Sequence, residues 1–176
     1  MNILILNKKE EKEYYSAILQ MLREADGEFF PPLSMRSSST QTELSNLEKN
    51  SNGVLNYFEE LKKQRFLVAC EDCELLAFVS YREEYLNSEI NEDFLPNIYI
   101  STLVVKPSAR GKGLTYKMYE KLFEEYKGTN IFTRTWSENT AHITILKRFG
   151  FDTFKVLEND RGAGIDTVYF IKKKEN

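Results

Sequence analysis

The sequence predicts one α/β domain in which a mixed sheet is flanked by helices, and three observations support this fold class. The chain has 176 residues, of which 41% are hydrophobic, and this suits a single core. Short β-branched or aromatic runs alternate with longer segments whose apolar residues recur every three or four positions. No Ser- or Pro-rich linker and no internal repeat divides the chain, so the domain is expected to span residues 1–176.

The first third of the chain predicts a strand followed by helices. Residues 2–6 group four aliphatic side chains beside a polar run, which is typical of a strand. Residues 10–25 carry apolar side chains at helical spacing, and Asp26-Gly27 ends this helix. The segment 29–40 contains two prolines and is expected to form a loop, either a substrate wall or a plain connection. Residues 43–49 and 54–63 are predicted to be helical.

The rest of the chain predicts strands with two further helices among them. Residues 98–105 form the most strand-like run, because they are β-branched and aromatic and are closed by Pro107. The acidic segment 83–93 before it reads as a loop. The other strands are expected at residues 65–70, 75–81, 131–135, 153–157 and 166–171, and the helices at 115–126 and 139–149. This order predicts a mixed α/β sheet flanked by helices.

Composition argues against several kinds of partner. The net charge of -3 and the sequence pI of about 5.4 disfavour nucleic acid, whose protein partners are usually basic. The basic run 172–174 is interpreted as a solvated end rather than a binding site. No stretch approaches the roughly 20 apolar residues that span a bilayer. The N-terminus places its apolar run before its charges, the reverse of a signal peptide, so we expect a cytoplasmic protein.

The two cysteines, Cys70 and Cys73, have a C-x-x-C spacing that invites a metal or redox interpretation. There is no second ligand pair, and the only histidine, His142, is far away in the chain. A redox site would also need a helix that starts at the first cysteine, whereas strand-like residues lie on both sides. A plain turn between two strands is therefore the favoured interpretation, and no metal is expected.

The stretch 103–115 carries the clearest chemical signal. A buried strand ends at Pro107, and a turn with Gly111 and Gly113 then opens a helix. Amides at a helix N-terminus and its dipole favour anions, and glycines let the backbone approach a ligand. Arg110 and Lys112 add positive charge, so the segment is typical of a pyrophosphate site. It is neither a P-loop, because the two glycines lie too close together, nor a dinucleotide fingerprint, because Tyr116 replaces the third glycine.

Residues 105–114 resemble motif A of the GNAT family of N-acetyltransferases, R/Q-x-x-G-x-G/A. Arg110, Gly113 and Thr115 fall on the three defined positions, and Thr115 departs from the usual Gly or Ala. Residues 139–151 are similar to motif B, whose helix opens with Asn and closes with Gly-Phe. The resemblance implies a mixed, mostly antiparallel sheet of six or seven strands with about four helices. It also implies a splayed pair of parallel strands, here ending at Val105 and Thr135, that holds an acyl-CoA.

The resemblance implies that acetyl-CoA, or a close acyl-CoA relative, is a co-substrate. The strand backbone would pair with the pantetheine arm and polarise the thioester, the turn would hold the pyrophosphate, and Asn139 would bond the pantetheine. The expected cofactor-binding residues are Leu103, Val104, Val105, Arg110, Gly111, Lys112, Gly113, Leu114, Thr115 and Asn139. A substrate amine would attack the thioester directly, and the protein would orient both substrates and stabilise the oxyanion.

The family's two usual proton-transfer residues are missing. Leu146 stands where many members have a Tyr that protonates the leaving thiolate, and Asn97 is nearest to the usual Glu base. Tyr99, Ser137 and His142 are the candidate catalytic residues, and His142 has the most suitable ordinary pKa. These departures keep open a second hypothesis, a non-catalytic acyl-CoA-binding domain that acts in sensing or assembly.

The acceptor is expected to be a primary amine of a small molecule or peptide. The acidic loop with Glu92 and Asp93 suggests a cationic acceptor, although a solvated loop explains the same residues. Phe29 and Phe30, in the proline-containing loop, are expected to form part of the same wall. Trp136 either lines the acceptor pocket or packs in the core. A homodimer is compatible with the sequence, which carries no clear signal for oligomeric state.

Overall fold

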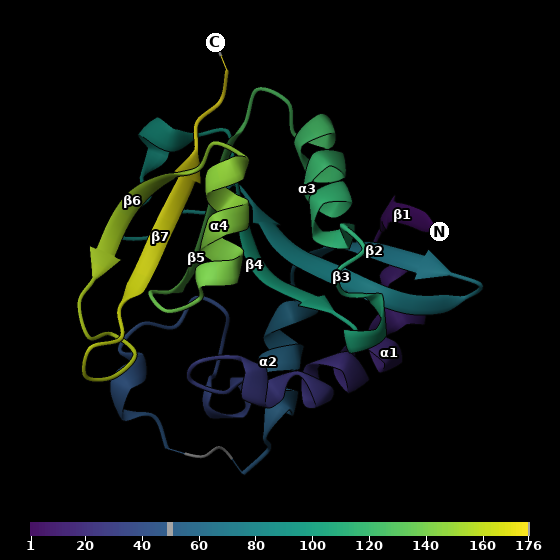
Figure 1. Cartoon of the computed structure of the whole chain (residues 1–176), viewed down its shortest axis with the longest axis horizontal. Coiled ribbons are helices and arrows are strands. Elements are labelled where there is room, and N and C mark those ends of the chain that lie inside the picture. Colours follow the sequence, from purple (N-terminus) through teal and green to yellow (C-terminus); the bar gives the residue numbers. More distant parts are fainter. Residues whose placement is uncertain (49–50, 176) are drawn as a thin grey trace.

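The computed structural model describes residues 1–48 and 51–175, and within them a seven-stranded sheet forms the centre of an α/β domain (Figure 1). The strands are β1 Asn2–Ile5, β2 Arg65–Glu71, β3 Glu74–Glu83, β4 Asn97–Val105, β5 Asn130–Trp136, β6 Asp152–Leu157 and β7 Thr167–Lys172. The α-helices of the described part are α1 Glu11–Glu24, α2 Val54–Leu61, α3 Leu114–Glu125 and α4 Thr140–Arg148. The predicted fold class is thereby confirmed.

The sheet has the order β1-β2-β3-β4-β5-β7-β6, and neighbouring strands are antiparallel except for β4 and β5. This parallel pair is in register only from Asn97 with Asn130 to Ile100 with Thr133. Both strands continue beyond these residues, so they separate over their second halves. The expected splayed parallel pair is therefore present.

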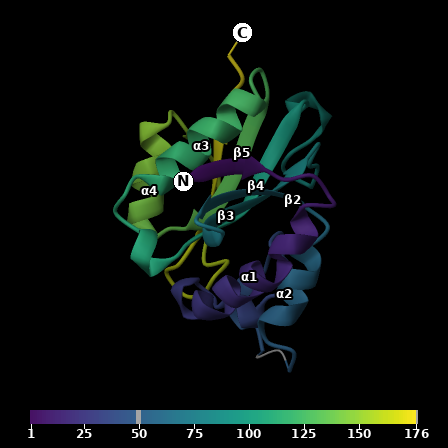
Figure 2. The ribbon, with the colours of Figure 1, turned by 90° about the vertical axis from the view of Figure 1, so that its right-hand side faces the viewer.

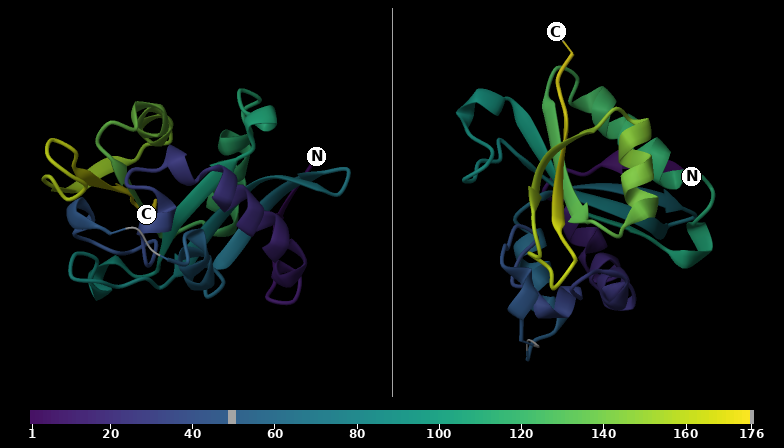
Figure 3. Two further views of the ribbon diagram at one scale, coloured as in Figure 1. Left: turned by 90° about the horizontal axis from the view of Figure 1, so that it is seen from below. Right: turned by 60° about the vertical axis from the view of Figure 1, so that its left-hand side comes forward.

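Helices cover both faces of the sheet, as Figures 2 and 3 show. In β2, Leu67 and Ala69 pack with α3 and α4, whereas Phe66 and Val68 pack with α1 and α2. Successive strand residues point to opposite faces, so the unbroken apolar run of this strand fits a sheet that is buried on both sides. The two resulting cores position α3 and α4 on one side of the splayed strands, and α1 and α2 on the other.

A third apolar cluster lies at the start of β4 and β5, where the acidic loop folds over the sheet. Tyr99 packs there beside Phe132, and Tyr85 and Phe94 of the loop cover them. Asn97 is buried and anchors this loop, because its side chain accepts a hydrogen bond from the amide of Tyr85 and donates one to the carbonyl of the same residue. The acidic loop is thus fixed at the end of β4 opposite to the separation of the strands.

Two segments test local sequence predictions. Within residues 43–48 of the predicted helix 43–49 the structure has only a short 3-10 turn, Leu44–Asn46, and Lys49 lies outside the described residues. The C-x-x-C segment is confirmed as a turn between β2 and β3, because Asp72 and Cys73 have φ angles of 48° and 65°, as a type I′ hairpin requires. Both cysteines are free.

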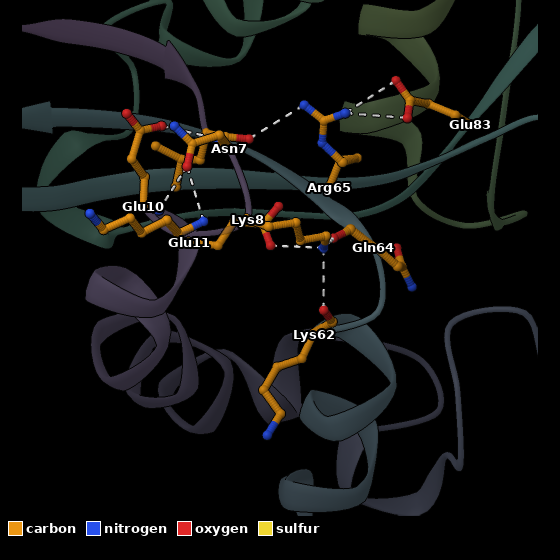
Figure 4. A network of polar contacts seen from close by, with 10 residues as sticks. Asn7, Lys8, Glu10, Glu11, Lys62, Gln64, Arg65 and Glu83 are labelled. Carbon is orange, nitrogen blue, oxygen red and sulfur yellow. Dashed lines mark hydrogen bonds and ion pairs between the residues drawn. The ribbon is translucent and has the colours of Figure 1, made fainter.

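A polar network ties the junction of β1 and α1 to the end of α2 (Figure 4). Asn7 closes the turn before α1, since its side-chain oxygen accepts from the amides of Lys9 and Glu10. Glu11 is completely buried, and the ammonium of Lys8 lies 2.8 Å from its carboxylate. Lys8 also donates to the carbonyls of Lys62 and Gln64. This one cation therefore links the first turn of α1 to the connection between α2 and β2.

In the described residues, no helix is both long and apolar enough to cross a membrane. The cytoplasmic location expected from the sequence stays a prediction.

Candidate active site

The separation of β4 and β5 opens a cavity of about 330 Å³. Its walls include Ile100 to Val105 on β4 and Thr133 to Trp136 on β5, together with residues of α4. It also reaches Phe29 and Arg36 from the segment after α1, which lies on the other face of the sheet. The cavity therefore extends from the side of α3 and α4, between the strands, to the side of α1 and α2.

A β-bulge in β4 marks the point where the strands part. Tyr81 of β3 pairs with Ile100 and Ser80 pairs with Thr102, so Ser101 has no opposite residue. A bulge bends its strand and increases the local twist. Beyond it, residues 102–105 keep β3 on one edge but have lost β5 on the other. This leaves the second edge of β4 facing the cavity, where an extended ligand can pair with it.

The turn before α3 presents unpaired amides, as the sequence predicts. None of the backbone N–H groups of residues 111–116 has a hydrogen-bond acceptor among the described residues, and Lys117 is the first that donates, to the carbonyl of Gly113. A second hollow of about 250 Å³ lies over this turn and shares Val105, Arg110 and Thr115 with the first cavity. The free amides thus lie at one end of a continuous depression, which fits a pyrophosphate.

Gly113 is required here by its backbone conformation. Its φ angle of 71° belongs to the left-handed region, which an L side chain adopts only with strain. A Cβ added to Gly113 would meet no atom within 4 Å, so the space above the turn is open. Lys112 is exposed beside it, whereas Leu114 is buried in the core and contributes only its backbone to the turn. Of the expected cofactor-binding residues Val104 also points into the core, on the α1 and α2 side.

Arg110 makes contacts that the sequence does not reveal. Its Nη2 atom lies 2.9 and 2.7 Å from the two carboxylate oxygens of Glu28, and its Nε donates to the carbonyl of Val105 at 3.0 Å. Both side chains are about half exposed and line the cavity. Arg110, which was expected to bind phosphate, is therefore neutralised by Glu28, a residue of the segment that follows α1.

The start of α4 brings Asn139 and His142 to the cavity. The side-chain oxygen of Asn139 caps the helix by accepting from the amide of His142, and its nitrogen donates to Thr135 at 2.9 Å. The Nε2 atom of His142 lies 2.8 Å from the hydroxyl of Tyr119 on α3. Burial of the ring lowers the pKa of His142 to about 4, so the imidazole is neutral at pH 7.

The other two candidate catalytic residues lie outside the cavity wall. Tyr99 is buried in the third cluster, where burial raises the pKa of its hydroxyl well above the ordinary range. Ser137 Oγ accepts a hydrogen bond from the amide of Asp166 and so closes the turn after β5. Leu146 is completely buried in the core, in agreement with its apolar character. Only His142 of the three candidates faces the cavity.

The acceptor wall differs from the one expected. Glu92 and Asp93 lie in a short 3-10 turn before β4, at the strand end opposite to the cavity, and neither lines it. This position gives no support to the expectation that they attract a cationic acceptor, which stays a prediction. Phe29 and Trp136 do line the cavity, and their ring centroids lie 6.4 Å apart. Phe30 is exposed and contributes its carbonyl as an acceptor for Arg161.

Three arginines of the wall were not predicted from the sequence. Arg36, Arg134 and Arg161 line the cavity and are buried. They come from three distant segments, and a lone arginine in a loop or strand is usually solvated, so no local pattern marks them. The hairpin loop between β6 and β7 lies beside the segment after α1 (Figure 1), where the amide of Glu43 donates to Asp160 and Arg161 donates to the carbonyl of Phe30.

The fold and the cavity between splayed strands define an acyltransferase-like α/β protein. A profile of the acetyltransferase (GNAT) family matches residues 19–151, and the chain belongs to this family. The curated proteins include no match to this chain.

Several solved structures share the fold. Ribosomal-protein-alanine N-acetyltransferase from Brucella melitensis is 18% identical with a TM-score of 0.65, over 98% of this chain and 99% of that chain. The yncA protein of Salmonella typhimurium, solved with its cofactor acetyl-CoA, is 16% identical with a TM-score of 0.66, over 99% and 94%. An aminoglycoside 6'-N-acetyltransferase complexed with coenzyme A is 15% identical with a TM-score of 0.67, over 98% and 96%. At these identities the likeness establishes the fold alone.

Proposed function

We propose that the protein transfers an acetyl group from acetyl-CoA to a primary amine of a small molecule or peptide, by direct attack in a ternary complex. The observation that carries this proposal is the cavity between β4 and β5, which leads from the free amides of residues 111–116 to the opposite face of the sheet. Relatives of the same fold were solved with acetyl-CoA or coenzyme A, which supports this co-substrate.

The chain's own groups fit the coenzyme. The amides of residues 111–116 offer donors to a pyrophosphate, and the open edge of residues 101–105 offers backbone partners to the pantetheine arm. An amide of the same edge can stabilise the oxyanion that forms on the thioester carbonyl. Asn139 lines the cavity beside them, although its side chain also caps α4. The binding residues proposed here are those expected from the sequence, with Leu114 and Val104 contributing backbone only.

Proton transfer is assigned to His142. Of the three candidates only its neutral imidazole lines the cavity, where it is placed to accept the proton that the amine loses on attack, and its pKa of about 4 makes it a weak base. The Tyr119 hydroxyl at Nε2 fixes the orientation of the ring. A thiolate is a fairly good leaving group, so the absence of a proton donor at Leu146 is compatible with turnover.

A second function is favoured by two specific observations. Leu146 lies in the core, and the Asn97 side chain is fully engaged with Tyr85, so neither of the positions that usually transfer protons in the family can do so. A protein that binds acetyl-CoA without using it would have these features. Saturable binding without thiol release from any amine would select this alternative.

The test combines binding and turnover. Free thiol is followed with acetyl-CoA and a panel of primary amines, while calorimetry measures coenzyme A affinity. Gly113→Glu is expected to abolish binding, because its carboxylate would occupy the space of the pyrophosphate. Gly128→Glu is the matched control: its φ angle of 78° and the empty space at its Cβ resemble those of Gly113, but it follows the far end of α3. Coenzyme A binding by Gly113→Glu equal to that of the control would contradict the proposal.

A further inference from the structure

Three buried arginines gather on the α1 and α2 side of the cavity. Arg36 follows a 3-10 turn at residues 33–35, Arg134 lies on β5, and Arg161 lies between β6 and β7. Their exposed fractions are 5%, 9% and 4%, and all three line the same cavity. Charged side chains are rarely so buried unless partners compensate for the lost water.

No carboxylate is in direct contact with these guanidinium groups. In the described part of the chain none of the three guanidinium groups forms an ion pair. The nearby acids act only at a distance: Asp26 accepts from the amide and hydroxyl of Ser34. Asp160 is linked to Arg161 only through the hydroxyl of Thr167, which accepts from Arg161 and donates to Asp160. The arginine partners are neutral oxygens, including the carbonyls of Pro31, Ser39 and Phe30. The wall therefore keeps its positive charge.

Each guanidinium also retains a nitrogen for a ligand. Nη1 of Arg36, Nε of Arg134 and Nη2 of Arg161 donate to no atom of the described residues. None of these nitrogens is among the buried polar atoms that are sealed without a partner, and the three residues that carry them line the cavity. The same region has apolar walls, because Arg36 lies 5.8 Å from the ring centroid of Phe29 and Arg161 lies 6.0 Å from that of Trp136.

The three cations also repel one another. Burial, followed by the charges of Arg36 and Arg134, lowers the pKa of Arg161 to about 9, which still leaves it protonated at pH 7. Burial likewise lowers the pKa of Arg36. An anion placed among them would relieve this repulsion, and Arg is the side chain best suited to planar or tetrahedral oxyanions.

We propose that the acceptor is a small amine that also carries an oxyanion, a carboxylate or a phosphonate, and that Arg36, Arg134 and Arg161 bind this group. The proposal rests on the acetyl transfer proposed above and adds the substrate class. In the reaction the amine nitrogen bonds to the acetyl carbon as the carbon–sulfur bond breaks. The sulfur takes the electron pair of the broken bond. The amine loses a proton, and the released coenzyme A gains one as its thiol. A polycationic acceptor would be repelled by this wall.

The same arginines also hold the loop after α1 through its carbonyls, so an experiment must separate binding from folding. Matched acceptors do this: L-amino acids against their α-carboxamides, and 2-aminoethylphosphonate against 2-aminoethanol. We expect kcat/KM to be about 10- to 100-fold higher for the anionic member of a pair, as for charge-assisted hydrogen bonds. Equal values, or a preference for the neutral member, would overturn the proposal.

Single-residue variants test which arginines cause the preference for the anionic acceptor. Arg36→Met and Arg161→Met are expected to lose most of the discrimination within each pair, while Arg36→Lys keeps part of it. Coenzyme A affinity should stay near the parent value, which a collapsed loop would not allow, and kcat/KM for 2-aminoethanol is measured in each variant as the reference for its pair. Arg23→Met, on the exposed face of α1, is the control. Unchanged discrimination in both Met variants would refute the assignment of these residues.

Trp136 is the only tryptophan of the chain and lies in this wall, so its fluorescence can report acceptor binding when no turnover occurs. Its fluorescence is titrated with both members of each pair in the presence of coenzyme A. A saturable change for the anionic members alone, with no acetyl transfer to any amine, would refute the proposed function and support the anion site. No saturable change and no turnover with any anionic amine would refute the anion site itself.

Discussion

The partly buried imidazole of His142 predicts a specific dependence of stability on pH. In the unfolded chain its pKa is about 6.5, whereas in the fold burial lowers the pKa to about 4. Above pH 6.5 neither state binds the proton. As the pH falls from 6.5 to 4, the unfolded chain binds a proton that the folded protein does not, so the free energy of unfolding decreases.

The size of this effect follows from the two pKa values. Between pH 7 and pH 5 His142 removes about 2 kcal/mol from the free energy of unfolding, out of about 3 kcal/mol over the whole range. Carboxylates also titrate at low pH, so a variant must isolate the histidine. His142→Gln does not titrate, and its carboxamide can still bond the hydroxyl of Tyr119.

The assay is urea unfolding at 25 °C, at pH 7 and pH 5 and at equal ionic strength, without coenzyme. From pH 7 to pH 5, the free energy of unfolding of His142→Gln is expected to rise by about 2 kcal/mol relative to that of the parent. Tyr119→Phe keeps the imidazole and should retain the pH slope of the parent. Parallel slopes for His142→Gln and the parent would refute the reasoning, since the ring would then titrate as it does in the unfolded chain.

Three further predictions concern the coenzyme end, the N-terminal network and the core. Glu28→Gln should free the guanidinium of Arg110 and lower the coenzyme A Kd, measured by calorimetry at low salt, by up to about 5-fold. An unchanged Kd would mean that the ion pair does not compete with phosphate. Lys8→Ala leaves the buried carboxylate of Glu11 without its cation and should lower the free energy of unfolding by about 2 kcal/mol. An unchanged free energy of unfolding would show that water replaces the ammonium. Leu146→Tyr, which supplies the family's usual hydroxyl, should overpack a fully buried position and lower stability by about 1–3 kcal/mol in thermal unfolding; an unchanged midpoint would show that the core has room.

Much of the coenzyme end could be predicted because its signal is local. The strand, the proline, the glycines and the helix start are contiguous in residues 103–115, and each restricts the backbone by itself. The structure accordingly has Gly113 in the left-handed region and free amides beside it. Helix and strand periodicity likewise identified most elements, whereas the predicted helix at 43–49 was reduced to one 3-10 turn over its described part. A short helix of this kind depends on packing more than on propensity.

The acceptor end could not be predicted, because its chemistry is created by distant segments. Glu92 and Asp93 precede the central strand in sequence, yet folding leaves them at the strand end opposite to the cavity. Arg36, Arg134 and Arg161 carry no local pattern, and only the tertiary structure buries them together. Backbone conformation is set by neighbours in the chain, so the sequence alone determined the fold class and the glycine turn with free amides before α3. The charge of a pocket depends on which segments meet and which lose their water, so only the tertiary structure decided that three arginines gather in the cavity wall on the side of α1 and α2.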